Sequence, residues 1–134
     1  MHRRTKMIYT CSIRNLNEFD SNTKKYAIVR SLKRPINGVT QLDILSPSKN
    51  LFYAYLRIKD AGKWNKDSFE QIYRPQFLHE MQSPEAQKML RTIVAQSKQQ
   101  DVVLACFCDN VQLCHRSIVA ELLHDLGAEI GYVK

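Results

Sequence analysis

The sequence predicts a three-layer α/β domain with a mostly parallel central sheet, and three observations support this fold class. Asp101 to Cys108 is a continuously apolar run, the pattern of a strand buried on both faces of a parallel sheet. Other short β-rich runs alternate with amphipathic helical patterns along the chain. The length of 134 residues, with 44% hydrophobic and 25% charged residues, is typical of one globular domain. We therefore expect residues 1–134 to form a single domain.

The first half of the chain is expected to hold two strands and a long loop. Residues 6–12 (KMIYTCS) are rich in β-forming residues, and residues 26–31 (YAIVRS) form a second short apolar run, so both are expected to be strands. The polar residues 15–25 between them are typical of a turn. Residues 34–48 contain two prolines and a glycine, which predicts a long loop, and Ser48 at its end is expected to cap a helix.

The second half is expected to be mainly helical around the apolar strand. Asp67 is expected to cap a helix that Pro75 kinks or interrupts, and residues 83–85 (SPE) predict the start of another. A last helix should end at Gly127, before a strand over residues 129–134. The expected apolar faces are Met89, Leu90, Ile93 and Val94 in the helix after residue 83, and Ile118, Val119, Leu122, Leu123 and Leu126 in the last helix.

The formal charge of +7 is concentrated in the first quarter of the chain. Residues 1–34 hold nine of the twenty basic residues against two acidic ones, whereas residues 35–134 carry eleven of each. A basic patch attracts nucleic acid or nucleotides. A solvated basic face accounts for the same pattern, because the run lacks interleaved aromatic residues and a nucleic-acid motif.

No segment of the sequence is typical of export or membrane insertion. The apolar runs stay below the roughly 18 residues that span a bilayer, and the apolar stretch near the N-terminus is too short for a signal peptide. We therefore expect a cytoplasmic protein with no membrane partner, whose four cysteines are reduced thiols.

The densest group of reactive side chains lies where the apolar strand meets the next helix, in DVVLACFCDNVQLCHRSIVAELL (101–123). Ligands of open α/β sheets bind at the carboxyl ends of the strands, which makes this run the candidate site. Cys114, His115 and Arg116 open the helix, where backbone N–H groups favour anions and lower the pKa of a thiol. His115 can exchange protons near neutral pH, and Arg116 can bind a phosphate or carboxylate through two hydrogen bonds.

Three interpretations of this run compete. Cys106, Cys108, Cys114 and His115 are the ligand types that zinc prefers, but C-x-C on an extended strand points the two sulfurs apart, and we expect no metal and no cofactor. A reactive Cys114 or Cys106 beside His115 is the second interpretation. Counted from Cys108, the spacing to Cys114 is C-x5-C and the spacing to Arg116 is C-x7-R. Both depart from the C-x5-R loop of tyrosine phosphatases and rhodaneses. In the third, the cysteines fill core space while His115 and Arg116 brace the loop.

The run resembles the family of domains of unknown function 488 (DUF488), whose C-terminal signature is an apolar strand ending in cysteine, a short loop, and CHR at a helix start. The resemblance covers most of the chain, in order and spacing. IYTCS (8–12) and AIVRS (27–31) are similar to the family's first two strands. LSPSKNL (45–51) is similar to its leucine-x-proline-serine loop, and SFEQIYRPQFL (68–78) to its helix with a central tyrosine.

The resemblance implies a single DUF488-like, Rossmann-like domain over residues 1–134, of a small phage or bacterial type, and a shared pocket. The residues it implies for that pocket are Arg30, Ser48, Tyr73, Cys106, Cys114, His115 and Arg116. The sequence departs from the family at Cys108, where relatives often carry an acidic residue two positions after the strand cysteine. A catalytic carboxylate is therefore absent at that position.

These residues predict a class of function but do not identify a reaction. We expect a pocket that binds a phosphate-bearing, nucleotide-like or nucleic-acid ligand through Arg30, Ser48, Tyr73 and Arg116, with Cys114, His115 and Cys106 as candidate catalytic residues. The alternative is a non-catalytic sequestering or protein-interaction module of phage or mobile-element type, with a host or partner protein as its target. Trp64, in a polar loop, either covers the pocket or packs beside it.

Overall fold

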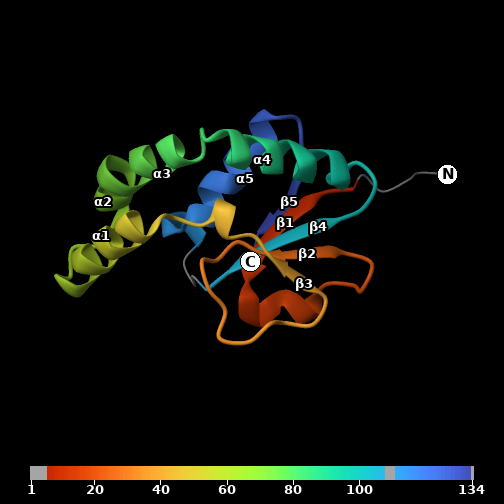
Figure 1. Ribbon diagram of the computed structural model, residues 1–134, viewed down its shortest axis with the longest axis horizontal. Helices are drawn as coiled ribbons and strands as arrows, with labels where there is room; N and C mark the ends of the chain where they lie inside the picture. Colours follow the sequence, from red (N-terminus) through yellow and green to blue (C-terminus); the bar gives the residue numbers. More distant parts are fainter. Residues whose placement is uncertain (1–5, 108–110, 134) are drawn as a thin grey trace.

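The computed structural model describes residues 6–107 and 111–133 and confirms the predicted three-layer α/β fold (Figure 1). The sheet of the described residues has the strand order β3-β2-β4-β1-β5, and each neighbouring pair is parallel. Its strands are β1 (Ile8–Ser12), β2 (Lys24–Ala27), β3 (Val39–Gln41), β4 (Val102–Cys106) and β5 (Ile130–Val133).

Helices connect the strands. The α-helices are α1 (Lys49–Asp60), α2 (Lys66–Ser68), α3 (Arg74–Glu80), α4 (Pro84–Ser97) and α5 (His115–Asp125). A π-helical stretch, η3 (Phe69–Tyr73), joins α2 to α3. The 3-10 helices are η1 (Ile13–Glu18), η2 (Asp43–Leu45) and η4 (Val111–Leu113).

The apolar strand occupies the centre of the sheet, as its composition predicts. All five residues of β4 are buried, and β1 and β2 pair with it on either side. A parallel strand with two covered faces needs apolar side chains in both directions, which the sequence VVLAC supplies. The carboxyl end of β4 therefore lies in the middle of one sheet edge, where Cys106 is its last residue.

The two faces of the sheet are covered unequally. On one face, α4 and α5 contribute Leu90, Ile93 and Ile118 to the main hydrophobic core. On the other face, a smaller core joins strand residues to Leu16 of η1. Figure 1 shows α4 and η1 on opposite sides of the strands.

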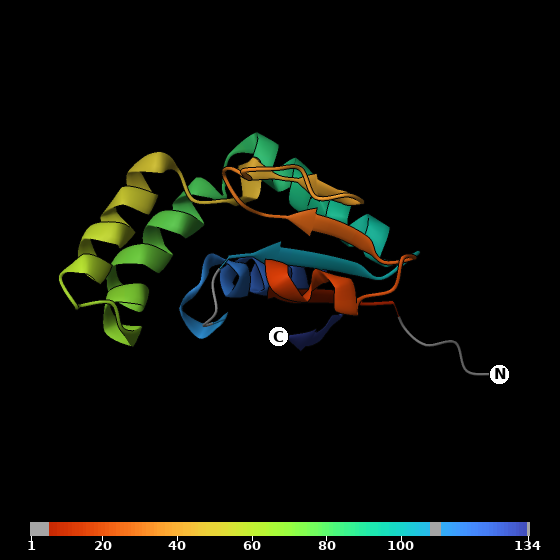
Figure 2. The same ribbon diagram turned by 90° about the horizontal axis from the view of Figure 1, so that it is seen from below.

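Residues 49–80 form a helical arm, which extends beyond the carboxyl ends of the strands (Figure 2). Its inner side belongs to the main core through Leu51, Phe69 and Phe77. Its two ends meet at the sheet, where the Ser48 backbone N–H and hydroxyl donate hydrogen bonds to Glu80, at 2.8 Å to Oε1 and 2.5 Å to Oε2. The start of α1 and the end of α3 are therefore held together by this contact.

The sequence correctly predicts two helix starts and misplaces a third. The Ser48 and Ser83 side chains accept hydrogen bonds from the Leu51 and Ala86 backbone N–H groups, as N-caps do. The residue that caps α2 is Asn65, which forms a capping box with Ser68, and not Asp67. The capping box satisfies two backbone donors, which explains why the helix begins before the acidic residue.

The helical path continues through Pro75, which is the second residue of α3. The interruption expected at this proline takes the form of the π-helical stretch η3 immediately before it. A wider π turn accommodates the backbone where proline supplies no N–H group. The tyrosine of this stretch, Tyr73, is thereby directed toward the sheet edge, where it is buried.

Three segment predictions in the first half need correction. Residues 34–48 are not a continuous loop, because β3 pairs with β2 as a three-residue edge strand and η2 follows it. A three-residue strand is too short to show the alternation of apolar and polar residues by which a strand between Pro35 and Pro47 is predicted. The second strand is β2 at residues 24–27, earlier than predicted, and the turn-like segment includes η1.

The predicted apolar faces of α4 and α5 are largely confirmed. Leu90, Ile93, Ile118, Val119 and Leu123 are buried, and Met89, Val94 and Leu122 pack partly buried against the core. Leu126 is 41% exposed, so its expected place on the buried face is wrong. It is the C-cap of α5 and the helical pattern no longer sets its direction. None of the helices in the described ranges has the length and apolar character needed to cross a membrane.

Candidate functional site

A cavity of about 720 Å³ lies between the helical arm and the carboxyl ends of the strands. Its walls come from the segments after β2 and β4, from the arm, and from the start of α5, which Figure 2 shows around the same end of the sheet. The lining residues are Val29, Arg30, Ser31, Ser46, Pro47, Lys49, Phe52, Tyr53, Tyr55, Trp64, Tyr73, Cys106, Phe107, Leu113, Cys114 and His115. No aspartate or glutamate belongs to this lining of described residues.

Aromatic rings of the arm form one wall. The Trp64 ring stands edge-on to Tyr55 at 4.6 Å and to Tyr73 at 5.5 Å between ring centroids. Phe77 stacks on Tyr73 at 6.1 Å and meets His115 of α5 at 5.6 Å. Trp64 therefore both packs within the arm and lines the cavity, so the two predicted roles of this residue coincide.

A cysteine–histidine group lines the cavity where β4 ends and α5 begins. The Cys106 Sγ is 3.2 Å from the Cys114 Sγ, and the Cys114 Sγ is 3.6 Å from the His115 Nδ1. All three residues are buried, and these three atoms lie within 4.8 Å of one another. The predicted catalytic residues are thus brought together at one point of the cavity lining.

His115 is held in one tautomer. Its Nε2 is 2.7 Å from the Ile28 carbonyl oxygen, and because a carbonyl only accepts, the Nε2 carries the proton. The Nδ1 therefore presents a lone pair to the sulfur atoms. The pKa of His115 is lowered to about 4, mainly because burial disfavours the charged imidazolium; the hydrogen bond to Ile28 opposes this shift, and the Arg116 charge adds to it. At neutral pH the imidazole is therefore uncharged, and its proton exchange is shifted from the expected near-neutral range toward pH 4.

Cys114 is disulfide-bonded, whereas Cys11 and Cys106 are not. The expectation that all four cysteines are reduced is therefore wrong for Cys114. The prediction relied on the absence of an export signal, which informs on compartment but not on which sulfurs approach each other. Cys108, whose sulfur was expected to point away from Cys106, lies outside the described residues.

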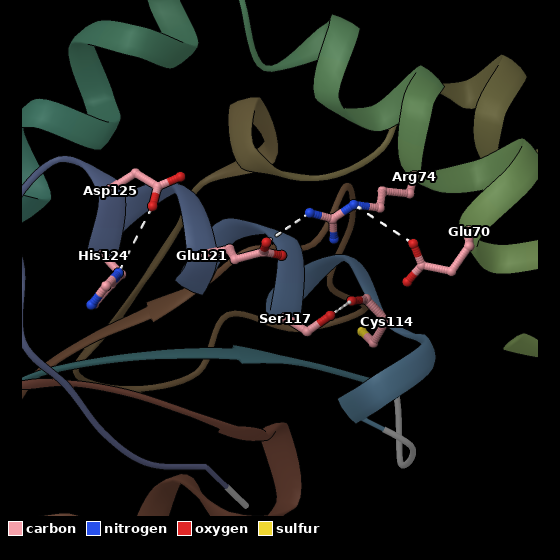
Figure 3. Close-up of polar contacts among 7 residues, drawn as sticks. All are labelled: Glu70, Arg74, Cys114, Ser117, Glu121, His124 and Asp125. Atoms are coloured by element: carbon pink, nitrogen blue, oxygen red, sulfur yellow. Dashed lines mark hydrogen bonds and ion pairs between the residues drawn. The ribbon is translucent and has the colours of Figure 1, made fainter.

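The start of α5 fixes the position of Cys114. Cys114 is the N-cap residue in an extended conformation, and the Ser117 hydroxyl donates a 2.8 Å hydrogen bond to its carbonyl (Figure 3). Figure 3 also shows Arg74 of α3 between Glu70 and Glu121. The Arg74 Nη2 is 2.8 Å from Glu121 Oε1, which ties the arm to α5 across the outer side of the site.

Basic side chains stand at the mouth of the cavity. Arg30 and Lys49 line it, and a neighbouring hollow of about 530 Å³, which shares Ser31 and Phe107, adds Lys33 and Arg34. The Arg30 Nε donates to the Pro47 carbonyl at 3.1 Å, which orients the guanidinium. None of these four cations pairs with a carboxylate within the described ranges 6–107 and 111–133.

The predicted ligand-binding residues fall into two groups. Arg30 and Tyr73 line the cavity, whereas Ser48 and Arg116 do not. The Ser48 hydroxyl is bonded to Glu80 and to the Leu51 N–H. The Arg116 side chain is completely buried, with Nη1 3.4 Å from Thr10 Oγ1 of β1, so it points under α5 toward the sheet.

The Tyr73 hydroxyl is a buried polar group of the cavity lining. The residue is 5% exposed and lines the cavity, and its hydroxyl forms no hydrogen bond within the part of the chain that the structure describes. Burial raises the pKa of Tyr73, and the charges of Glu80 and Cys106 raise it further. The hydroxyl therefore keeps its proton and is a hydrogen-bond donor at all physiological pH values.

Sequence reasoning did not single out many of the lining residues. They include Lys49, Phe52, Tyr53, Phe107 and Leu113. Of these, Phe52, Tyr53 and Phe107 are large hydrophobic residues left 42%, 55% and 62% exposed. The signal was present in α1, where the aromatic residues 52, 53 and 55 span more than one face of the helix, which a one-sided core contact does not need.

The fold and site define a class of protein. It is a parallel α/β domain whose strands end at an aromatic cavity that contains a cysteine–histidine group. The chain matches the DUF488-N3a family model, described as the active DUF488-N3 subclade, over residues 9–127. This protein therefore belongs to the DUF488 family, which confirms the resemblance drawn from its motifs. Searches among curated proteins and among solved structures found no match.

Proposed function

We propose that this protein binds a phosphate-bearing, nucleotide-like ligand in the cavity at the carboxyl ends of the strands. The observation that carries the proposal is the pairing of an aromatic wall with cations that have no acidic neighbour. Arg30 and Lys49 line the cavity, Lys33 and Arg34 line the adjoining hollow, and no carboxylate lines either hollow within the described residues. Cations without a carboxylate partner in two adjoining hollows repel each other, and an anion relieves that repulsion.

The size and lining of the cavity support a ligand with a planar ring. Cavities of roughly 300–1,000 Å³ hold small ligands and cofactors, and this one is about 720 Å³. Nucleobases stack on aromatic side chains, and Phe52, Tyr53 and Phe107 offer exposed rings at the opening. The base is therefore assigned to the aromatic side, and the phosphates to Arg30, Lys49 and the adjoining hollow.

Two polar groups of the lining can orient the ligand in the cavity. The Arg30 guanidinium, held by the Pro47 carbonyl, can direct its remaining N–H groups at a phosphate. The Tyr73 hydroxyl, buried and protonated, can donate to an oxygen or ring nitrogen of the ligand inside the cavity. Arg116 is assigned a different role, since its contact with Thr10 braces the start of α5 from below.

The proposal includes a catalytic part, for which the description of the matched subclade as active is one support. Cys106 is the proposed nucleophile, because its thiol lines the cavity and carries no disulfide. His115 is the proposed acid–base group, because its uncharged Nδ1 faces the sulfur atoms. Cys114 orients this pair through its contacts to both.

Fluorescence of Trp64 tests ligand binding directly, because it is the one tryptophan of the chain and lines the cavity. We expect ATP to change the emission in a saturable way, and adenosine or inorganic triphosphate alone to bind more weakly. Arg30→Ala should weaken ATP binding by roughly tenfold to a hundredfold, the loss expected for a charged hydrogen bond. Arg91→Ala, at an exposed cation of α4 outside the lining, is the matched control.

A short single-stranded oligonucleotide in the same titration separates a free nucleotide from a nucleic-acid ligand. Tighter binding of the oligonucleotide than of ATP would assign the site to nucleic acid. An unchanged Trp64 spectrum with all of these probes, in a folded protein, would contradict the proposal.

The second candidate function is a non-catalytic sequestering or protein-interaction module. The observation that favours it is the exposure of Phe52, Tyr53 and Phe107 around one opening, since exposed apolar groups at one place are typical of contact surfaces. Incubation with ATP followed by mass spectrometry separates the two functions. An enzyme converts the nucleotide in a Cys106-dependent manner, whereas a sequestering module returns it unchanged.

A further inference from the structure

We propose that Cys106, Cys114 and His115 form a zinc site when Cys114 is reduced, with a fourth coordination position that opens into the cavity. This inference goes beyond nucleotide binding and does not depend on it. In the zinc-bound form, Cys106 and His115 serve as ligands in place of the catalytic roles proposed above. It also revises the expectation that the chain holds no metal. Two thiol sulfurs and an imidazole nitrogen are the ligand types that zinc prefers, and here the three atoms lie within 4.8 Å of one another.

One of the three ligand distances fits a tetrahedral ion as it stands, and the other two need small side-chain adjustments, because the Cys106 Sγ and the imidazole nitrogen are placed only within 4.8 Å of each other. With Zn–S of about 2.3 Å and Zn–N of about 2.1 Å, a tetrahedral angle separates sulfur from nitrogen by about 3.6 Å and two sulfurs by about 3.8 Å. The Cys114 Sγ and His115 Nδ1 are 3.6 Å apart. The Cys106 and Cys114 sulfurs are 3.2 Å apart and need to separate by roughly half an ångström, which a rotation about either Cα–Cβ bond supplies.

The orientation of His115 is the second independent observation. A metal-bound histidine donates its other ring N–H to a carboxylate or a backbone carbonyl, which fixes the ring and its tautomer. His115 does this through Nε2 and the Ile28 carbonyl, at 2.7 Å, and so directs the Nδ1 lone pair at the sulfurs before any ion arrives. All three ligands also line the cavity, so an ion among them is reached from it.

The chemistry requires one reduction and releases protons. A phosphine or thiol reductant converts the Cys114 disulfide into thiols. Each Zn²⁺ then replaces the thiol protons of Cys106 and Cys114, so two protons leave to water while the neutral His115 donates its lone pair without a proton change. Three protein ligands and one open position are the arrangement of zinc sites that bind a water or substrate, whereas purely structural sites use four protein ligands.

The spacing of the cysteines in the sequence does not reveal this site, because the two cysteines nearest in sequence, Cys106 and Cys108, are not the pair that forms it. Cys106 and Cys108 are close in sequence, but C-x-C on a strand points successive side chains apart. The ligands come instead from a strand end and the following helix start, which the parallel β4–α5 connection brings together. No spacing rule for paired zinc knuckles describes this combination of ligands.

Cobalt titration tests the proposal. The reduced protein, freed of phosphine under anaerobic conditions, should bind one Co²⁺ with the intense visible bands of a tetrahedral ion and a near-ultraviolet band from thiolate to cobalt. Zn²⁺ should displace it. Cys106→Ser and His115→Gln should each weaken Co²⁺ binding at least about tenfold, since even the loss of an outer partner of a ligand costs 10–100-fold. Cys11→Ser is the matched control, because Cys11 is buried in the small core of the other sheet face.

Two outcomes would overturn the zinc site. One is a reduced, folded wild-type protein that develops no cobalt bands. The other is a Cys106→Ser spectrum equal to that of Cys11→Ser. If a variant fails to fold, alkylation of the wild-type chain decides instead, because Zn²⁺ should slow labelling of both Cys106 and Cys114, and equal rates with and without Zn²⁺ contradict the site. Nucleotide titrations on chelator-treated protein keep the two proposals separate, since either can fail alone.

Discussion

At the scale of single residues, His115 shows how the backbone sets the chemistry of a side chain. The Ile28 carbonyl, just after β2, receives the Nε2 proton, and this contact crosses 87 positions of sequence. The sequence places a histidine at a helix start, where it is equally able to face solvent. Only the packing of α5 against the segment after β2 makes it neutral and directs Nδ1 at the sulfurs.

The first prediction concerns pH and stability. The pKa of His115 is about 4 when folded and 6.5 as a free side chain, so between these values the unfolded chain binds a proton that the folded chain does not. Its contribution to stability is complete above pH 6.5 and is lost as the pH falls toward 4, by about 3 kcal/mol in total at about 1.4 kcal/mol per pH unit.

Urea unfolding of chelator-treated protein at several pH values measures this slope. Subtraction of the His115→Gln curve isolates the contribution of His115. His124→Gln is the control and should keep the full slope, because that side chain is 70% exposed. Parallel curves for wild type and His115→Gln would contradict the prediction.

Arg116 marks the limit of prediction at this scale. Its type and its position at a helix start predict an anion contact, yet the side chain is completely buried against Thr10 of β1. Residues 115 and 116 differ by about 100° around a helix, so one residue faces the cavity and the next faces the sheet. The rotation of α5 about its axis decides which, and the sequence carries no direct signal for it.

At the scale of elements, the Ser48–Glu80 contact joins the two ends of the helical arm. Glu80 is the last residue of α3 and Ser48 caps α1, so one carboxylate fixes both ends of a 32-residue excursion, residues 49–80. The aromatic wall of the cavity belongs to this arm. The geometry of the cavity thus depends on a contact at its edge.

The second prediction follows from this contact. Glu80→Ala should lower the free energy of unfolding by about 2 kcal/mol, as expected for hydrogen bonds to a charged group, and should broaden or shift Trp64 emission as the arm loosens. Glu70→Ala is the control, because that carboxylate is exposed and its 3.8 Å contact with Arg74 contributes little. Chemical denaturation with a fluorescence readout measures both effects, and equal losses in the two variants would count against the contact.

The third prediction tests a helix start that the sequence predicted correctly. Ser83 caps α4 by accepting from the Ala86 N–H at 3.2 Å, so Ser83→Ala should cost about 1 kcal/mol of stability. Thr92→Ala, at an exposed position of the same helix, should change stability by well under that amount. The difference between the two midpoints in urea is the measurement, and a larger effect at Thr92 would refute this account of the cap.

Element prediction succeeded where the local signal was strong. Ser83-Pro84-Glu85 and the apolar run of β4 act within a few residues, and both are found where predicted. The edge strand β3 was missed, because three residues gain their structure only from pairing with β2. Such a strand is a property of the assembled sheet and not of its own sequence.

At the scale of the whole molecule, the excess charge and the cavity are linked. The basic first quarter contributes Arg30, Lys33 and Arg34 to the two hollows at the sheet edge, beside the acid-free cavity lining. The composition indicated a basic region, but only the fold brings part of it to the site. Charges gathered at one opening attract an anionic ligand over several ångströms and respond to salt.

The fourth prediction is therefore a salt dependence of nucleotide binding. The Kd of ATP, measured by Trp64 fluorescence, should rise several-fold, on the order of threefold to tenfold, between low salt and a few hundred millimolar NaCl, because salt screens exposed charges. The Arg30→Ala, Lys49→Ala double variant should show a flatter dependence than Arg91→Ala. A salt-independent Kd would mean that the mouth cations take no part in binding.

The strand order also governs how the chain reaches this structure. β1 is completed first during synthesis, yet both of its neighbours, β4 and β5, come from the last third of the chain, and Met7 bonds to Asp101 across 94 positions. The arm, whose contacts are short in sequence, can form long before. The nascent protein should thus carry β1 unpaired until β4 emerges, and the site, which needs the end of β4, is among the last features to assemble.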